Sequence, residues 1–331
     1  MLISWNTTRQ CNLRCRHCYR DATAEPEADE LTTDEGRTLI GEIAACGFKV
    51  LVLSGGEPLM REDICDLVAA TGEAGMRPVL GSNGTLITAE AARGLKEAGT
   101  ARVGISLDSA HAPIHDDLRM VAGAFDRALE GMAHCKAAGL PFQIHTTVTS
   151  QNYDEIEAIA HKAVELGAAA YHVFFLVHTG RAKSMEEEDL HVGQYEALLR
   201  NIIRLQRVLP IELKPTCAPQ FMRIAKQMGV EMRFTKGCLA GLAYGCVLPN
   251  GDVHPCPYLP MKVGNVRETP FTTIWRESPV LLQLRHEKPE GRCGICQYQA
   301  ICGGCRARAY AYTGNYMAEE PWCPYQPDRT T

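Results

Sequence analysis

Fifteen cysteines in a chain of 331 residues constrain the fold more than any other feature of this sequence. In a reducing compartment, so many thiols are expected only where metal holds most of them. Three of them lie at residues 11–18, and nine crowd the part of the chain after residue 216. The other three, Cys46, Cys65 and Cys135, stand singly within helical patterns, and we interpret these as buried structural residues.

Charge and hydropathy exclude several classes of function. The net charge is −5 and no basic run is present, which argues against a surface that follows nucleic-acid phosphates. No apolar stretch approaches the about 20 residues of a membrane span. The first residues lack the charged and apolar regions of a secretory signal. We therefore expect a cytoplasmic protein without a nucleic-acid or membrane partner.

The first two thirds of the chain alternate short apolar runs with amphipathic helical patterns, which predicts βα units and a parallel sheet. The expected strands cover residues 2–7, 50–53, 78–81, 102–107, 142–149 and 171–177. The expected helices cover residues 33–46, 61–74, 89–98, 123–138, 154–166 and 192–209. Six strands joined by right-handed helical crossovers predict an α/β fold, a partial (β/α)6 TIM-like barrel.

The last part of the chain has a different texture, rich in cysteine, glycine and proline with few periodic segments. A segment of this size and composition does not build an ordinary core and usually needs metal to fold. We therefore expect the barrel at residues 1–209, a linker with a helix at 210–235, and a small loop-rich domain that holds metal at 236–331.

The first group of residues capable of chemistry is Cys11, Cys15 and Cys18, spaced C-x3-C-x2-C directly after the first strand. Thiolates suit iron–sulfur clusters or zinc. Three thiolates hold three corners of a cubane and leave the fourth iron open. Zinc is disfavoured because only His17 is available nearby, and it stands between two of the cysteines.

A second motif, Ser54-Gly-Gly-Glu-Pro58, follows the second strand. Its two glycines allow the backbone to approach a ligand closely, and the carboxylate of Glu57 can accept from an ammonium group. Alone, this motif is equally consistent with a tight turn. It lies one βα unit after the cysteine motif, and both motifs are expected at the same mouth of the barrel. Together the two motifs are a highly specific signal of function.

Together these motifs resemble the radical S-adenosylmethionine superfamily over about residues 1–180, with His17 in the aromatic position of the cysteine motif. The resemblance implies a [4Fe–4S] cluster on the three cysteines, whose open iron chelates the methionine amine and carboxylate of S-adenosylmethionine. It further implies cofactor contacts from Gly55, Gly56, Glu57, Asn83, Ser106 and Asp108. Arg119 would pair with the methionine carboxylate, although a surface salt bridge is an equal alternative.

The C-terminal cysteines resemble the SPASM extension of radical enzymes, which holds two auxiliary [4Fe–4S] clusters. One departure is that the last spacing, Cys302-Gly-Gly-Cys305, is x2 where x3 is usual. The family pattern implies one cluster on Cys238, Cys246, Cys256 and Cys305, and another on Cys293, Cys296, Cys302 and Cys323. Cys217 is a competitor for the first cluster, a substrate-side group, or a structural residue.

Several C-terminal motifs, including Pro-Asn-Gly-Asp-Val-His-Pro-Cys at 249–256, resemble the haem-synthesis branch, which removes carboxyl-bearing side chains from an iron tetrapyrrole. In a decarboxylase the 5′-deoxyadenosyl radical would take a hydrogen from a propionate, and loss of carbon dioxide and one electron would leave a vinyl group. An external donor such as flavodoxin or ferredoxin would reduce the first cluster. Five further residues would approach the substrate, each with an ordinary structural alternative: Arg306, Arg308, His145, His172 and His178.

Two other functions remain open at this stage. A peptide maturase that modifies a ribosomally made precursor shares much of this framework, although the first strand begins within five residues of Met1 and leaves no room for an N-terminal peptide-binding module. A pure electron-transfer protein does not account for a three-cysteine site beside a Gly-Gly-Glu-Pro loop.

Overall fold

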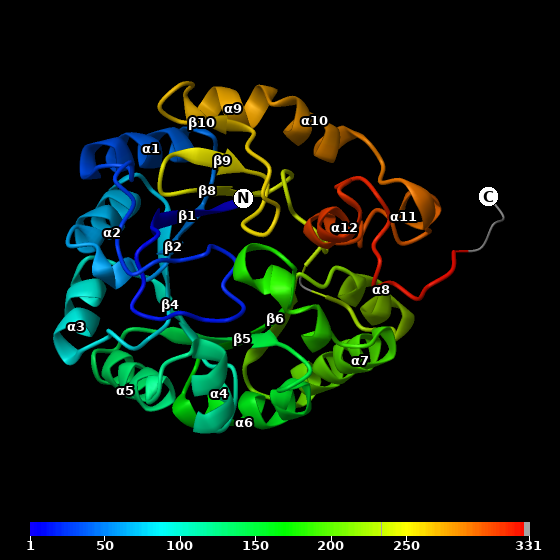
Figure 1. The fold of residues 1–331 in the computed structure, drawn as a ribbon, viewed down its shortest axis with the longest axis horizontal. Coiled ribbons are helices and arrows are strands. Elements are labelled where there is room, and N and C mark those ends of the chain that lie inside the picture. Colours follow the sequence, from blue (N-terminus) through cyan, green and yellow to red (C-terminus); the bar gives the residue numbers. More distant parts are fainter. Residues whose placement is uncertain (233, 328–331) are drawn as a thin grey trace.

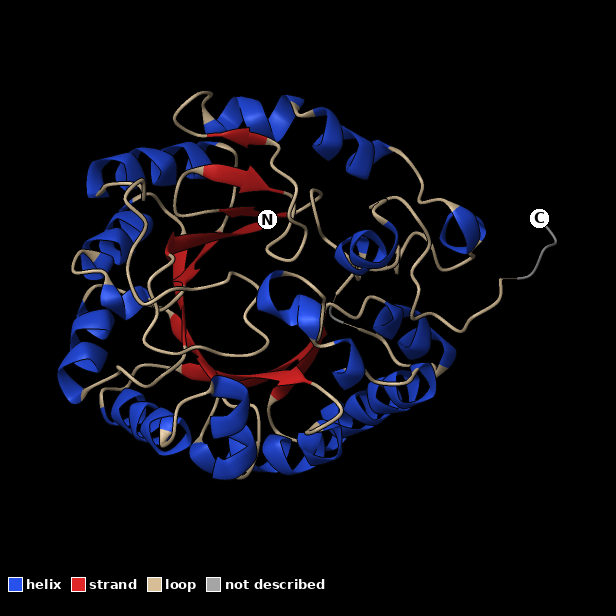
Figure 2. Cartoon of the chain, viewed as in Figure 1, coloured by secondary structure: helices blue, strands red, loops and turns tan. Residues whose placement is uncertain are grey.

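The computed structural model describes residues 1–232 and 234–327 as an arc of parallel strands inside a ring of helices (Figures 1 and 2). The parallel strands are β1 (Leu2–Thr8), β2 (Val50–Gly55), β3 (Arg77–Ser82), β4 (Arg102–Ser106), β5 (Phe142–Val148), β6 (Ala170–Phe175) and β7 (Glu212–Thr216). The helices around them are α1 (Thr33–Ala45), α2 (Ile64–Glu73), α3 (Ala89–Glu97), α4 (Ala112–Arg119), α5 (Ala124–Ala137), α6 (Ile156–Leu166), α7 (Val192–Val208) and α8 (Gln220–Gln227). The expected fold class is confirmed.

The C-terminal part continues the same sheet. Its strands are β8 (Tyr244–Val247), β9 (Asp252–His254) and β10 (Gly264–Asn265), and the sheet order is β10-β9-β8-β1-β2-β3-β4-β5-β6-β7. β8 pairs in parallel with β1, from Leu2 opposite Tyr244 to Trp5 opposite Val247. Four helices follow: α9 (Phe271–Glu277), α10 (Pro279–His286), α11 (Gly291–Ile295) and α12 (Arg306–Thr313). The backbone pairing therefore runs across the boundary that we expected between two domains.

Two elements differ from the expectation. β7 is a seventh parallel barrel strand within the segment expected as a linker, and it pairs with β6 over five residues. Its sequence, Glu-Leu-Lys-Pro-Thr, is short, polar and interrupted by proline, so its pattern is not that of an ordinary buried strand. α4 follows β4 and was also not expected; its eight residues give too short a helical period to recognise.

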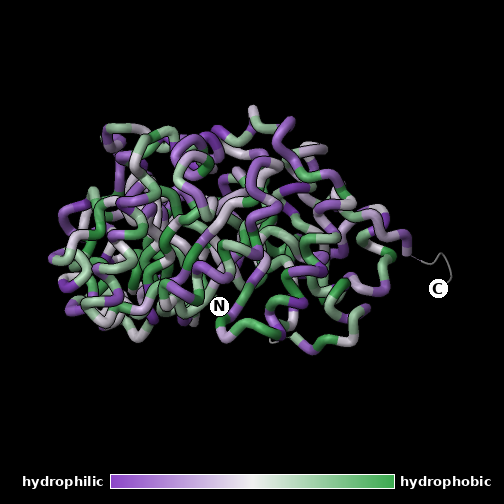
Figure 3. Tube along the Cα trace, turned by 90° about the horizontal axis from the view of Figure 1, so that it is seen from below, coloured by the Kyte–Doolittle hydropathy of each residue, from purple (hydrophilic) through white to green (hydrophobic). Residues whose placement is uncertain are grey.

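The core lies between the strands and the surrounding helices. Ile3 and Trp5 of β1 are fully buried, and the apolar faces of the helices cover the outside of the sheet. Gly36 of α1 is required because a Cβ there would lie 2.4 Å from the Trp5 ring. In Figure 3, hydrophobic segments of the chain run through the middle of the molecule. No helix within the described residues combines the length and apolar character needed to cross a bilayer.

Candidate active site and metal centres

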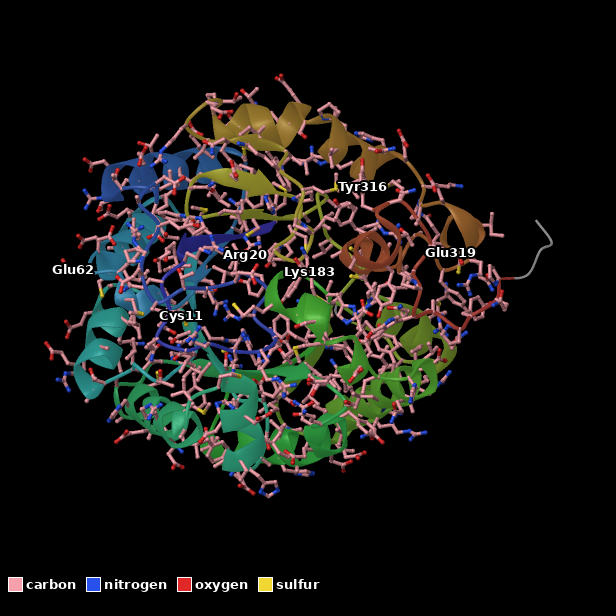
Figure 4. All side chains as sticks on the ribbon, in the orientation of Figure 1. Cys11, Arg20, Glu62, Lys183, Tyr316 and Glu319 are labelled. Carbon is pink, nitrogen blue, oxygen red and sulfur yellow. The ribbon has the colours of Figure 1, made fainter. Side chains whose placement is uncertain are left out.

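A cavity of about 210 Å³ opens at the carboxyl ends of the barrel strands. This is where parallel barrels generally carry their sites. The cysteine loop after β1 forms one wall, and the loop after β2 and the ends of β3 to β6 form others. Tyr244 and Tyr258 face the cavity from the C-terminal part. In Figure 4 the labelled Cys11 and Arg20 lie inside the ring of helices, whereas Glu62 lies at the outer edge of the molecule.

Cys11, Cys15 and Cys18 all line this cavity, the first two buried and the third half-buried. The pKa of the Cys11 thiol is raised to about 12, chiefly by burial and to a smaller extent by the neighbouring Glu57, Cys15 and Cys18. No three His, Cys, Asp or Glu side chains in the described part of the chain converge on the volume of a single metal ion. These grouped thiols are costly to ionise unless metal holds them. They fit an iron–sulfur cluster, because the ligands of a cluster lie further apart than the ligands of a single ion.

Gly55 and Gly56 serve the contact between two loops. A Cβ on Gly55 would lie 2.4 Å from the Thr8 carbonyl oxygen, and one on Gly56 would lie 2.2 Å from that of Gln10. The Gly56 amide donates to Thr8 at 2.7 Å, which joins the β2 loop to the start of the cysteine loop. Both glycines also line the cavity, so their backbone faces the expected cofactor position.

Glu57 does not face the cavity, which corrects its expected contact with the methionine amine. Its carboxylate is fully buried and accepts from the backbone amides of Leu59 and Asn83 and from the Ser82 hydroxyl. Burial raises its pKa to about 7, although these hydrogen bonds oppose the shift. Glu57 therefore joins the β2 loop to the end of β3.

Asn83 and Ser106 do line the cavity. The Asn83 amide donates to the Cys11 sulfur at 3.8 Å and to the Asn12 side-chain oxygen at 2.8 Å. Asn83 therefore lies between the cysteine loop and the end of β3, and Ser106 stands at the end of β4.

Asp108 differs from its expected role, because its carboxylate is fully buried and lies outside the cavity lining. Its Oδ2 pairs with Arg119 at 2.6 Å, and its Oδ1 accepts from the Thr147 amide. Burial opposes ionisation, but Arg119 and the nearby His17 hold the pKa of Asp108 below its usual value. Arg119 also donates to the Cys15 sulfur at 3.5 Å and lines the cavity. Asp108 therefore orients Arg119 against the cysteine loop.

Arg181, in the loop after β6, has no motif that would have marked it in the sequence. Its guanidinium donates to the backbone oxygens of Cys15 and Ala22, both at 2.8 Å, and it lines the cavity. The preceding Gly180 has a φ of +60°, and a Cβ there would lie 2.4 Å from the Cys18 carbonyl oxygen. The β6 loop therefore holds the cysteine loop from the side opposite the β2 loop.

In the C-terminal part, Cys217 packs in one cluster with Cys238, Cys256 and Cys305. Burial raises the pKa of Cys217 well above its usual value, and the other three thiols raise it further. Cys246 is not part of this packed cluster: it is fully buried on β8, and its thiol donates to the Asn6 side-chain oxygen at 3.4 Å. The structure thus groups Cys217, where the family pattern implied Cys246, with the other three cysteines. The sequence named Cys217 as a competitor for this cluster, but it did not decide between Cys217 and Cys246 because Cys217 lies before the C-terminal motif.

Cys293, Cys296, Cys302 and Cys323 line a second, smaller cavity of about 30 Å³. This is the expected second auxiliary set, brought together from three separate segments. The Glu320 amide donates to the Cys293 sulfur at 3.3 Å, and Arg223 of α8 lines the same cavity.

Arg306 and Arg308 are structural residues, which excludes them as free substrate contacts. Arg306 donates to the backbone oxygens of Tyr316 and Ala318. Arg308 is fully buried, pairs with Glu320 at 3.5 Å and donates to the Leu176 carbonyl oxygen. Of the three candidate histidines, only His145 lines the cavity. His172 lies outside the lining, and His178 pairs with Asp189 away from the cavity.

Comparison with known proteins agrees with this geometry. Residues 5–163 match the family described as the Radical SAM superfamily, and residues 238–305 match SPASM, an iron–sulfur cluster-binding domain. The chain is 46% identical to the AdoMet-dependent heme synthase of Methanosarcina barkeri, over 99% of this chain and 97% of that protein. It is 34% identical to the Fe-coproporphyrin III synthase of the same organism, over 97% and 87% of the two chains.

The fold is also that of a solved structure, Streptococcus suis SuiB bound to S-adenosylmethionine. The two superimpose with a TM-score of 0.80 at 19% identity, over 98% of this chain and 77% of that chain. Relatives named as peptide cyclases or maturases are less similar, at 29–31% identity.

Proposed function

Because this chain belongs to the radical SAM superfamily, in the haem-biosynthesis branch and with a SPASM domain, we propose that it removes carboxyl carbon from side chains of an iron tetrapyrrole. It is a radical SAM enzyme that uses S-adenosylmethionine and [4Fe–4S] clusters. The named relatives support the tetrapyrrole, and propionate decarboxylation to vinyl groups is the reaction that we favour. A peptide substrate is the weaker alternative because the relatives named for peptides are more distant.

The observation that carries this proposal is the cavity that joins Cys11, Cys15 and Cys18 to the ends of β3 to β6. We propose that these three cysteines hold the first cluster, and that Gly55, Gly56, Asn83, Ser106 and Arg119 line the cofactor position. When bound, the first cluster supplies the electron that cleaves S-adenosylmethionine reductively, and the auxiliary clusters offer further sites for electrons.

For the first auxiliary cluster we propose Cys217, Cys238, Cys256 and Cys305, and for the second Cys293, Cys296, Cys302 and Cys323. The protein's own contribution is to position the reactants and to exclude water. The buried Glu57 and the Asp108–Arg119 pair serve the first task. We also propose a low-potential donor such as flavodoxin or ferredoxin, and the cytoplasm as the compartment, because cluster thiolates need a reducing environment.

The test is anaerobic incubation of the reconstituted protein with S-adenosylmethionine, a reductant and iron-coproporphyrin III, followed by mass spectrometry. We expect 5′-deoxyadenosine and loss of one or two carbon dioxide units from the tetrapyrrole. Cys15→Ala is expected to abolish both products, whereas Cys46→Ala, a cysteine distant from the cavity, retains them. Formation of 5′-deoxyadenosine with an unchanged tetrapyrrole would overturn the substrate and leave the enzyme class standing.

A further inference from the structure

Two histidines lie side by side on β5 and β6, and one of them, His145, lines the cavity at the carboxyl ends of the barrel strands. His145 on β5 is directly opposite His172 on β6, and their rings stack at 5.4 Å with an interplanar angle of 9°. His145 is also opposite Ser106 of β4, and both line the cavity. Of the two imidazoles, only that of His145 can therefore reach a ligand there.

The hydrogen bonds assign the proton of His145. Arg102 donates to the side-chain oxygen of Gln143 at 3.1 Å, and because a guanidinium can only donate, this fixes the orientation of the amide. The Gln143 nitrogen then faces the imidazoles and lies 2.7 Å from Nε2 of His145. Nε2 must accept, so the network assigns the proton to Nδ1. Burial keeps the ring neutral, lowering its pKa to about 4.

The ring is also held in place sterically. A Cβ on Gly104 of β4 would lie 2.3 Å from Cε1 of His145, so the ring occupies the space that any larger residue would need. Within the described residues, Nδ1 of His145 has no hydrogen-bond partner. The result is a neutral imidazole with a fixed orientation and one N–H group left for a ligand.

The surrounding charges favour an anionic ligand at this position. Arg102 and Lys214 both approach the histidine pair, and neither forms a salt bridge within the part of the chain that the structure describes. Asp108, the acid that faces His145, is already paired with Arg119. S-adenosylmethionine carries a net positive charge, whereas a propionate carries a negative one. A neutral donor close to two cations that form no salt bridge therefore suits a carboxylate better than it suits the cofactor.

We propose that the Nδ1–H of His145 donates to the carboxylate of the substrate side chain that enters this cavity, with Gln143 and Gly104 as its positioning residues. This inference rests on the proposed function, because it takes the substrate to be an iron tetrapyrrole that bears propionates. In this proposal, the hydrogen bond from His145 orients the substrate side chain that loses its carboxyl group.

The test is anaerobic titration of the reconstituted protein with iron-coproporphyrin III in the presence of S-adenosylmethionine, followed by the tetrapyrrole absorption band. We expect His145→Phe to weaken binding about tenfold to a hundredfold, the worth of a hydrogen bond to a charged acceptor. His145→Asn, whose amide can donate near the position of Nδ1, is expected to stay within about threefold of wild type. Gly104→Ala, which displaces the ring, is expected to resemble His145→Phe. His161→Phe, on an exposed position of α6, is the matched control.

Affinity for S-adenosylmethionine, measured separately by calorimetry, is expected to be unchanged in all four variants. Circular dichroism establishes that each variant is folded. Equal tetrapyrrole affinity of His145→Phe and wild type would overturn the inference and leave the proposed function intact. Weaker cofactor binding with unchanged tetrapyrrole binding would also overturn it, since the donor would then serve the cofactor. If the wild type does not bind the tetrapyrrole, the proposed function fails, and the inference fails with it.

Discussion

At the scale of single residues, the spacing of the motifs predicted which residues gather at the barrel mouth. It did not predict the direction in which some of their side chains point. Asn83 and Ser106 line the cavity as expected, but Glu57 and Asp108 turn their carboxylates into the protein. The direction of a buried carboxylate depends on donors far away in sequence: for Glu57 the amide of Asn83, and for Asp108 the guanidinium of Arg119. No local pattern encodes such partners. The sequence offered Cys217 as a competitor for the first auxiliary cluster, and it could not decide between Cys217 and Cys246 for the same reason.

Replacement of Cys217 and Cys246 tests the first auxiliary cluster. We expect Cys217→Ala to lower the iron content of the reconstituted protein from about twelve atoms to about eight, because a fourth thiolate is lost from one of three clusters. Cys246→Ala is expected to retain about twelve, since that thiol bonds to Asn6. Iron analysis with Mössbauer spectroscopy measures both. Iron loss in Cys246→Ala alone would restore the ligand set that the family pattern implies.

Glu57 gives a pH dependence that can be isolated by one substitution. Its pKa is about 7 in the folded protein, raised from 4.5 chiefly by burial. Between about pH 4.5 and 7 the folded state therefore holds a proton that the unfolded state has lost, and the free energy of unfolding falls as the pH rises. Relative to Glu57→Gln, we expect wild type to lose on the order of 3 kcal/mol between pH 5 and 8 in denaturant titrations. A pH-independent difference between the two proteins would contradict this assignment.

At the scale of elements, the period of apolar residues predicted most strands and helices of the barrel to within a few positions, because amphipathic helices and buried strands must present an apolar face. β7 was missed because its five residues include two charges and a proline. The loops that matter most for the site also have no period. The cysteine loop is held between the β2 loop, through Gly55 and Gly56, and the β6 loop, through Gly180 and Arg181.

Arg181 tests this bracing of the cysteine loop. Arg181→Met removes two hydrogen bonds to the loop backbone and leaves the three cysteines in place. We expect the first cluster to lose iron to a chelator several times faster, as measured by the decay of the electron paramagnetic resonance signal that responds to S-adenosylmethionine. Arg204→Met, at an exposed position of α7, is expected to match wild type. An unchanged rate in Arg181→Met would remove this residue from the support of the loop.

At the scale of the whole molecule, composition predicted a barrel followed by a cysteine-rich part, and it could not show that one sheet runs through both. Residues 271–275 pack on the barrel core, where Phe48 contacts the rings of Phe271 and Trp275. Between residues 288 and 327, by contrast, the structure describes two short helices and few buried apolar side chains. Metal is therefore expected to support the end of the chain more than β8 to β10.

Removal of the clusters with a chelator under anaerobic conditions tests this gradient. We expect limited proteolysis of the stripped protein to cut first within residues 287–327, with β8 to β10 and the barrel cut much later. Mass spectrometry of the fragments locates the sites, and the reconstituted protein is the control. First cuts between residues 236 and 265 would contradict the expected gradient and would mark a separate C-terminal unit.

The pairing of β8 with β1 has a consequence for any attempt to shorten this protein. A chain ended before residue 244 would leave the backbone groups of Leu2 to Trp5 without their neighbours on that side. An exposed, apolar strand border of this kind recruits strands from other molecules. The isolated barrel is therefore expected to self-associate. By covering β1, the C-terminal part keeps the whole enzyme soluble, in addition to holding metal.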